Sequence, residues 1–202
     1  MSLTNIKDES PYTAPKAELA SASLHNLIEN NAFYVVSRSK LVILSFCTLN
    51  LYLLFWFYRN WKLYRDNSDF SCIPILRAIF NLFFIHSLFT QVNDALQSKH
   101  LPDKASGLMA TLYVISIVVS VVTNQWEPTT DQLAPFVLLF MVTLGLQLLP
   151  ILYIQKRINL VCDDPQAEQN NRLSWFNGLL ILPGILYWGS LFMSVFMTFL
   201  WL

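Results

Sequence analysis

Three polar side chains within one apolar stretch are the first candidates for chemistry. Arg77, Asn81 and His86 all lie in residues 73–92, where most side chains are hydrophobic. An ionisable group at membrane depth is costly and is therefore a functional candidate, and an imidazole can carry protons, bind a metal ion or act as a general base. On one helix, Asn81 would fall about 40° and His86 about 180° from Arg77. Polar residues on opposite sides predict that other helices or water surround this segment.

The rest of the sequence offers these residues no catalytic partners. No other long apolar stretch contains His, Asp or Glu, and the three Cys form no Cys-x-x-Cys pair. No phosphate-binding glycine loop, nucleophile elbow or His-Glu-x-x-His sequence occurs. The sequence therefore predicts no catalytic residue, no cofactor and no metal site. His86 is interpreted as a side chain that is hydrogen-bonded between helices.

Arg77 is interpreted as a structural anchor, because it lies near the start of its segment and its long side chain can reach the lipid headgroups. Its expected partner depends on the topology. If residues 73–92 span the membrane, Arg77 lies near the outer face and meets Glu127 or Asp131. If they lie in the interface, Arg77 is cytoplasmic and meets an acidic residue of a later loop, which contains Asp163, Asp164 and Glu168.

The composition favours an integral membrane protein. Of 202 residues, 13 are basic, 13 are acidic and 54% are hydrophobic. Only 13% are charged, against about 25% in a typical soluble domain, and the mean hydropathy is +0.45. A disordered chain would be poor in apolar residues, and a nucleic-acid-binding protein needs a basic surplus, so both classes are excluded.

Charges are missing from stretches that are long enough to cross a bilayer, whose hydrocarbon core needs about 20 helical residues. The sequence therefore predicts an all-α, polytopic membrane protein with five hydrophobic helices. Four are expected to be clear spans, and the segment 73–92 either spans or lies in the interface. The expected segments are 41–58, 73–92, 108–126, 132–155 and 174–202. They form a single helical transmembrane domain, 32–202, which follows a polar and flexible N-terminal tail, 1–31.

An aromatic and basic cluster closes the first segment. Trp and Tyr favour the headgroup level of a bilayer, and Lys and Arg extend to it. The cluster is therefore predicted to be an interfacial anchor, and this interpretation is preferred to a nucleic-acid patch. Its members are Trp56, Tyr58, Arg59, Trp61 and Lys62.

The positive-inside rule does not distinguish two topologies. Either all five segments span and the N-terminus is cytoplasmic, or 73–92 stays in the interface and 59–107 is wholly cytoplasmic. Both place 93–107 and 156–173 in the cytoplasm, and 127–131 and the C-terminus outside. We favour five spans, because 73–92 is long and mostly apolar.

Three motifs carry a resemblance to a known family: FYxVSxxKL from residue 33, TxxxYxxxWFYxNW from residue 48 and PxLRAxF from residue 74. They resemble a family of small uncharacterised bacterial inner-membrane proteins of the domain-of-unknown-function type. One group of that family has the motif TxGxYxxYW, and Asn50 stands in place of its glycine. The resemblance covers about residues 33–92. It implies a bacterial polytopic membrane protein, but no catalytic residue and no substrate.

Two functions are expected. The first is a non-enzymatic structural or partner-binding protein, multi-pass in the bacterial cytoplasmic (inner) membrane. Its partners would be the lipid bilayer, other membrane proteins or further copies of itself, but not nucleic acid. The alternative is a small transporter or channel subunit with a polar cavity near His86 and Asn81. An enzyme acting on lipid would need converging acid–base groups that the sequence does not offer.

Overall fold

The computed structural model describes residues 32–201, so the expected tail 1–31 lies outside the described residues. Residues 32–201 contain helices and no strand, which confirms the all-α class. In chain order the helices are α2 (Arg38–Cys47), α3 (Leu51–Asp66), α4 (Pro74–Ile79), α5 (Asn81–Ser98), α6 (Gly107–Thr123), η1 (Thr130–Gln132), α7 (Leu133–Val161), η2 (Glu168–Asn170) and α8 (Trp175–Trp201). The last three expected segments correspond to single helices, α6, α7 and α8.

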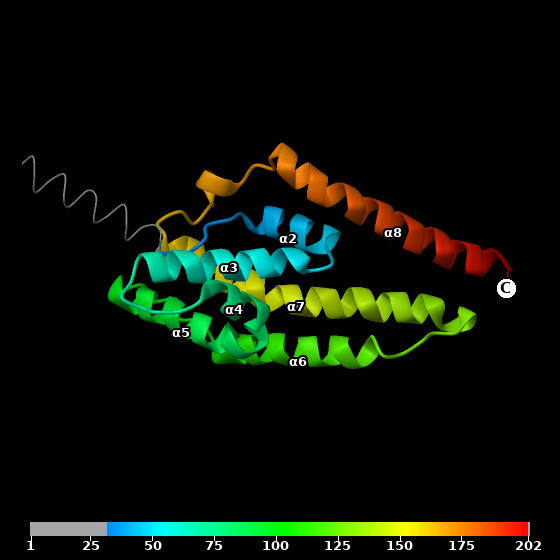
Figure 1. The fold of residues 1–202 in the computed structure, drawn as a ribbon, viewed down its shortest axis with the longest axis horizontal. Helices are drawn as coiled ribbons and strands as arrows, with labels where there is room; N and C mark the ends of the chain where they lie inside the picture. Colours follow the sequence, from blue (N-terminus) through cyan, green and yellow to red (C-terminus); the bar gives the residue numbers. More distant parts are fainter. Residues whose placement is uncertain (1–31, 202) are drawn as a thin grey trace, which may run out of the picture.

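The prediction of one spanning helix over 41–58 is wrong. α2 and α3 run in opposite directions and join through a tight turn at 48–50, so they form a helical hairpin (Figure 1). Leu49 and Asn50 in this turn have φ angles of 52° and 66°. A right-handed helix cannot continue through two residues in the left-handed conformation.

Hydrogen bonds at the turn explain why the hairpin is stable. The Asn50 N–H donates to the Ser45 carbonyl at 2.7 Å, which is the outer bond of a Schellman motif at the end of α2. The Thr48 hydroxyl accepts a bond of 2.9 Å from the Tyr52 N–H, and thereby caps the start of α3. Every backbone N–H of residues 48–53 has a partner, so this turn can lie in apolar surroundings.

The expected segment 73–92 is also divided, into α4 and α5, with Phe80 at the break. The Asn81 amide donates to the Ala78 carbonyl at 2.9 Å and satisfies a backbone group there. α4 packs against α3. Because Arg77 and His86 lie on different helices, the 180° separation expected on one helix does not apply.

The long helices define the shape of the molecule (Figure 1). α6 and α7 pack side by side, and α5 packs against both. α8 packs against α2, and α7 and α8 extend far beyond the hairpin turn. The core lies where α3, α5 and α7 meet, and includes the fully buried Trp56, Phe57, Ile85 and Ile154.

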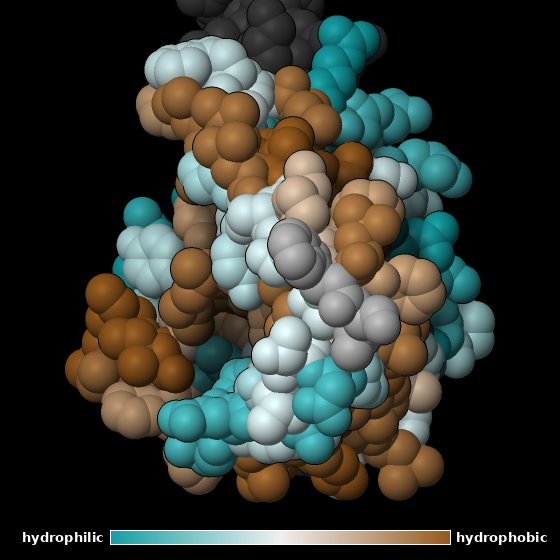
Figure 2. All heavy atoms as spheres, turned by 90° about the vertical axis from the view of Figure 1, so that its right-hand side faces the viewer, coloured by the Kyte–Doolittle hydropathy of each residue, from teal (hydrophilic) through white to brown (hydrophobic). Residues whose placement is uncertain are grey.

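Two helices are long and apolar enough to cross a membrane, Thr130–Val161 and Trp175–Leu200, and α6 is apolar but shorter. This is fewer than the five helices expected. Only 11% of the apolar window of α8 is buried, whereas the core helix of a soluble protein would be mostly buried. Figure 2 looks onto the end where α8 terminates, and hydrophobic side chains cover much of that face.

Candidate functional site: a groove between the hairpin and α8

The structure does not bring the predicted polar residues together. The Arg77 guanidinium lies 4.3 Å from the ring centre of Trp61, 4.8 Å from that of Phe70 and 4.7 Å from that of Phe84, and it donates to the Ser87 hydroxyl at 3.3 Å. Cation–π attraction therefore holds it. Neither group of acidic partners expected from the two topologies contacts it.

Asn81 and His86 occupy different surroundings. Asn81 is buried and accepts a bond of 2.7 Å from the Tyr113 hydroxyl of α6. His86 is exposed, and its Nε2 lies 3.2 Å from the Thr111 hydroxyl, also on α6. The expected hydrogen bond of His86 to another helix is therefore present, but it lies at the surface and is not buried.

The predicted anchor cluster is partly wrong. Trp56 and Trp61 are fully buried, so these two rings cannot lie among lipid headgroups. The Trp56 indole N–H donates to Gln155 of α7 at 2.5 Å, which makes this ring part of the core. Tyr58 and Lys62 are half-buried, as is Arg59, and for these three the anchor role stays a prediction.

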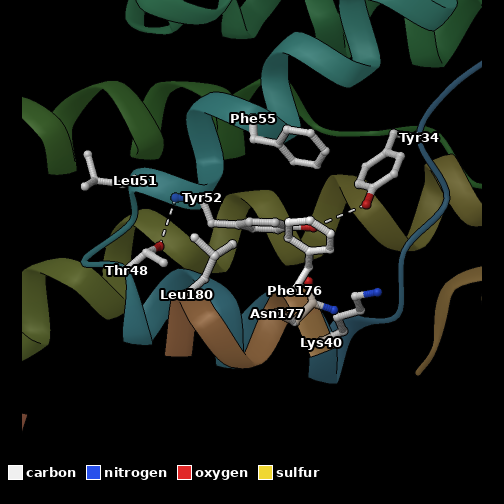
Figure 3. A pocket seen from close by; sticks show the side chains of 9 residues that line it. All are labelled: Tyr34, Lys40, Thr48, Leu51, Tyr52, Phe55, Phe176, Asn177 and Leu180. Carbon is white, nitrogen blue, oxygen red and sulfur yellow. Dashed lines mark hydrogen bonds between the residues drawn. The ribbon is translucent and has the colours of Figure 1, made fainter. Parts of the chain in front are cut away.

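The structure instead forms a groove between the α2–α3 hairpin and the first half of α8, which we call the hairpin groove. Its volume is about 570 Å³, within the range of small-molecule sites, roughly 300–1,000 Å³. Figure 3 shows Phe55 and Leu51 of α3 on one side, and Phe176 and Leu180 of α8 on the other. The walls are therefore mainly apolar.

Polar groups gather at the end of the groove where α2 begins. Lys40 is only 8% exposed, and its ammonium donates to the Asn170 amide oxygen at 2.6 Å and to the Arg172 carbonyl at 2.9 Å. An ammonium has three donors, so one hydrogen remains for a ligand. Burial lowers the pKa of Lys40 from its ordinary value, and an anion beside it would oppose that shift.

Two phenols and an amide complete this polar end. The hydroxyls of Tyr34 and Tyr52 lie 3.3 Å apart and point toward each other in Figure 3. The Asn170 amide donates to the Tyr34 hydroxyl at 3.0 Å. The Asn177 amide nitrogen is buried without a hydrogen-bond partner, although the residue lines the groove. A buried donor without a partner is unfavourable, and a bound acceptor would satisfy it.

About one turn beyond Leu180, α8 contacts the end of α2 directly. A Cβ atom on Gly184 of α8 would collide with the carbonyl oxygen of Cys47, the last residue of α2. One turn further, the Trp188 indole N–H donates to the Phe46 carbonyl at 3.1 Å, and the two rings stack with centres 4.5 Å apart. These contacts fix α8 on the hairpin and so set the width of the groove.

Sequence reasoning missed this site. Lys40 and Tyr34 belong to the motif FYxVSxxKL, but their partner Asn170 lies 130 or more positions away in the chain, and Asn177 lies further still. The signal that was available is the pair of amides at the start of the last apolar segment. Without the fold, nothing connected these amides to the motif.

No protein-family model matches this chain, and neither a curated protein nor a solved structure matches it. Within residues 32–201 no group of three or more His, Cys, Asp or Glu residues could hold a metal ion. The chemistry of the hairpin groove therefore depends on its own side chains. These side chains form an apolar groove with a cation, hydroxyls and an amide at one end.

Proposed function

We propose that this chain is a non-enzymatic integral protein of the bacterial cytoplasmic membrane, and that it binds a single-chain anionic amphiphile in the hairpin groove. The observation that carries the proposal is the graded lining of the groove, from Lys40 at one end to apolar side chains at the other. The bacterial origin rests on the resemblance of residues 33–92 alone.

Exposed apolar side chains support membrane insertion. Phe192, Met193, Phe196 and Phe199 of α8 are between 49% and 81% exposed. Contiguous apolar surface of this kind would be unfavourable in water and is stable in hydrocarbon. α6 has 17 residues, near the lower limit of about 17 for a span. We therefore include it as a third spanning helix beside α7 and α8.

The hairpin would enter the bilayer without crossing it. α2 has 10 residues and so rises about 15 Å, half of a hydrocarbon core of about 30 Å. Non-helical backbone at this depth is tolerated only where protein covers it. The Asn50 amide at the turn donates to Gln147 of α7 at 2.9 Å, and Trp188 of α8 binds the Phe46 carbonyl, so two spanning helices cover the turn.

The charge distribution supports one orientation. Residues 105–155 and 173–201, which contain the three proposed spans, have no Lys or Arg. The loop between α6 and α7 carries only Glu127 and Asp131 as charged side chains. The positive-inside rule therefore predicts that this loop lies outside. The opposite end, where the Lys and Arg residues of 32–201 lie, would be in the cytoplasm.

Reporter fusions test the topology. Fusions after Arg65, Lys104 and Asn170 should report a cytoplasmic location, and a fusion after Thr130 should report an external one. An external signal after Arg65 would contradict the hairpin, because it would require α2 and α3 to cross the membrane together.

The amphiphile would lie along the groove like its neighbours in the bilayer. Its headgroup would meet Lys40 and Asn177 at the cytoplasmic end, and its chain would extend past Leu180 toward the turn. An anionic headgroup fits the free donor of Lys40 and the unpartnered amide of Asn177, because charge-assisted hydrogen bonds are the stronger kind.

Native mass spectrometry of the purified full chain with oleate tests this binding. Leu180→Trp should fill the groove and weaken oleate binding about tenfold, the effect of about 1.4 kcal/mol. Leu186→Trp is the matched control, because Leu186 is on the same helix, is 66% exposed and does not line the groove. Equal oleate binding by both variants would reject the proposal.

The choice of headgroup is tested with Lys40→Gln. This variant should lose most of the preference for oleate over oleyl alcohol, because it removes the ammonium and keeps a hydrogen-bonding side chain. If oleyl alcohol binds the unmodified protein as tightly as oleate, the groove does not select an anion.

A second cavity favours the transporter alternative. It has a volume of about 230 Å³ and lies at the hairpin turn, with Asn50, Asn81, Tyr113 and Gln147 in its lining. These uncharged amide and hydroxyl groups would suit a small neutral solute. In proteoliposomes, glycerol permeation would then be reduced by Gln147→Leu, whereas His86→Ala should leave it unchanged because His86 does not line this cavity. Permeation equal to that of empty liposomes would reject this alternative.

A further inference from the structure

We propose that an anionic phospholipid headgroup binds a second site, in a groove between α2, α6 and α7 that we call the basic groove. Its volume is about 430 Å³. Its charged lining is cationic, with Arg38, Lys156 and Arg157, and its apolar walls include Leu149 and Leu152. The proposal rests on the membrane insertion proposed above, but not on amphiphile binding in the hairpin groove.

Arg157 is the fixed element of the basic groove. It is only 8% exposed, its Nη2 pairs with an oxygen of Asp103 at 2.7 Å, and its guanidinium lies 3.7 Å from the ring centre of Tyr153. Its Nε is buried and has no hydrogen-bond partner. A guanidinium held in this way is preorganised for a phosphate, and it gives the groove a fixed positive charge.

The groove also has excess positive charge. Arg38 and Lys156 are exposed, and neither forms an ion pair with a carboxylate among residues 32–201. Asp103 offsets one of the three cations, so the groove retains about two positive charges. This surplus is complementary to a phosphodiester and explains why we choose an anionic headgroup instead of a zwitterionic one.

The position of the groove selects a lipid as the source of this phosphate. Lys156 and Arg157 follow directly after the charge-free stretch 132–155, so they lie where α7 leaves the proposed bilayer on its cytoplasmic side. Leu152 and Leu149, one and two turns deeper, line the same groove, and Leu149 is 54% exposed. A headgroup on the cations would thus place its acyl chains along these leucines, as in basic pockets between transmembrane helices.

Thermal unfolding in a nonionic detergent, with added phosphatidylglycerol or phosphatidylcholine, tests the proposal. Phosphatidylglycerol should raise the Tm of the full chain more than phosphatidylcholine does. In Lys156→Gln the apparent affinity for phosphatidylglycerol should fall about fivefold, the effect of ~1 kcal/mol per basic residue near a membrane surface. Arg38→Gln should have a similar effect. Higher salt should weaken the difference between the two lipids.

Lys104→Gln is the matched control, because Lys104 is exposed at the same end of the molecule and lines a different hollow. An equal loss in Lys104→Gln would show that general surface charge explains the effect and would overturn the proposal. Equal stabilisation by both lipids, or by inorganic phosphate at the same concentration, would also overturn it.

The Leu180→Trp variant separates this inference from the proposed function. It should bind less oleate and keep the full response to phosphatidylglycerol, because Leu180 lies in the hairpin groove. Loss of the lipid response in that variant would show that the two sites are not independent and would contradict the assignment of the headgroup to the basic groove.

Discussion

Gly184 of α8 lies directly against the carbonyl oxygen of Cys47 at the end of α2, with no space between them for a side chain. Small residues allow helices in a membrane to approach this closely. This contact joins the last helix to a hairpin more than 130 residues earlier in the chain, and α8 otherwise packs little on the rest of the fold.

Gly184→Ala should displace α8 from the hairpin and destabilise the protein by about 1–3 kcal/mol, as for an overpacked core. Thermal unfolding in detergent measures the loss, and oleate binding should weaken in parallel because the groove changes width. Gly189→Ala is the matched control, since a Cβ atom there meets nothing within 4 Å. A Gly184→Ala variant as stable as Gly189→Ala would contradict the contact.

Asn50 is expected to have two separable roles in the hairpin turn. Asn50→Gly keeps a residue that tolerates positive φ and removes the side-chain bonds to Gln147 and, at 3.4 Å, to the Leu144 carbonyl, so we expect a loss of about 0.6 kcal/mol. Asn50→Leu should lower the free energy of unfolding by roughly a further 1–2 kcal/mol, because its Cβ and branched side chain disfavour the left-handed conformation. The two unfolding curves measure the difference, and equal stability of the variants would argue against the turn.

Gln155 should be essential for the packing of residues 33–36, which precede α2. Its amide nitrogen donates to the Tyr34 carbonyl at 3.0 Å and to Asn159 at 2.6 Å, while its oxygen accepts from Trp56. Gln155→Leu leaves these buried groups without partners, and each such group should lower the free energy of unfolding by about 1–3 kcal/mol. We expect a strongly lowered Tm, whereas Gln166→Leu at an exposed position should have little effect. A similar Tm for both variants would contradict this network.

The three cysteines should react at different rates with N-ethylmaleimide. Cys162 is 2% exposed, and burial raises its pKa to about 11, so about one thiol in ten thousand is ionised at pH 7. Cys72 is half-buried in a loop before α4 and should react first. Because the raised pKa limits the thiolate, the rate at Cys162 should increase as the pH rises toward 11. Mass spectrometry of labelled peptides measures each rate, and equal rates at Cys72 and Cys162 would contradict the burial.

In intact membranes, Cys47 provides an independent check on the hairpin. It lies at the hairpin turn, at the depth where we place the middle of the bilayer, so a membrane-impermeant maleimide should not label it from either side. Labelling from the external side would show that residues 41–58 cross the membrane after all.

Hydropathy was sufficient to predict the long helices, because it depends on local composition. The charge-free stretches 108–126, 132–155 and 174–202 correspond to α6, α7 and α8. The same reasoning failed over 41–58 and 73–92, because a helical hairpin and a single span can have the same apolar composition. The turn at 48–50 contains no Gly or Pro, and the single Asn50 is only a weak local signal of a chain reversal.

The sequence by itself determined the all-α class, the positions of α6, α7 and α8 and the segregation of the charges, since each depends on neighbouring residues. Tertiary structure alone decided that α2 turns back, because contacts with α7 and α8 stabilise two residues in a conformation that is unfavourable for most side chains. The tertiary structure also decided which residues line the two grooves. Lys40 meets Asn170 across 130 residues of chain, and Arg157 meets Asp103 across 54, and such long-range pairs depend on how the helices pack rather than on any local pattern.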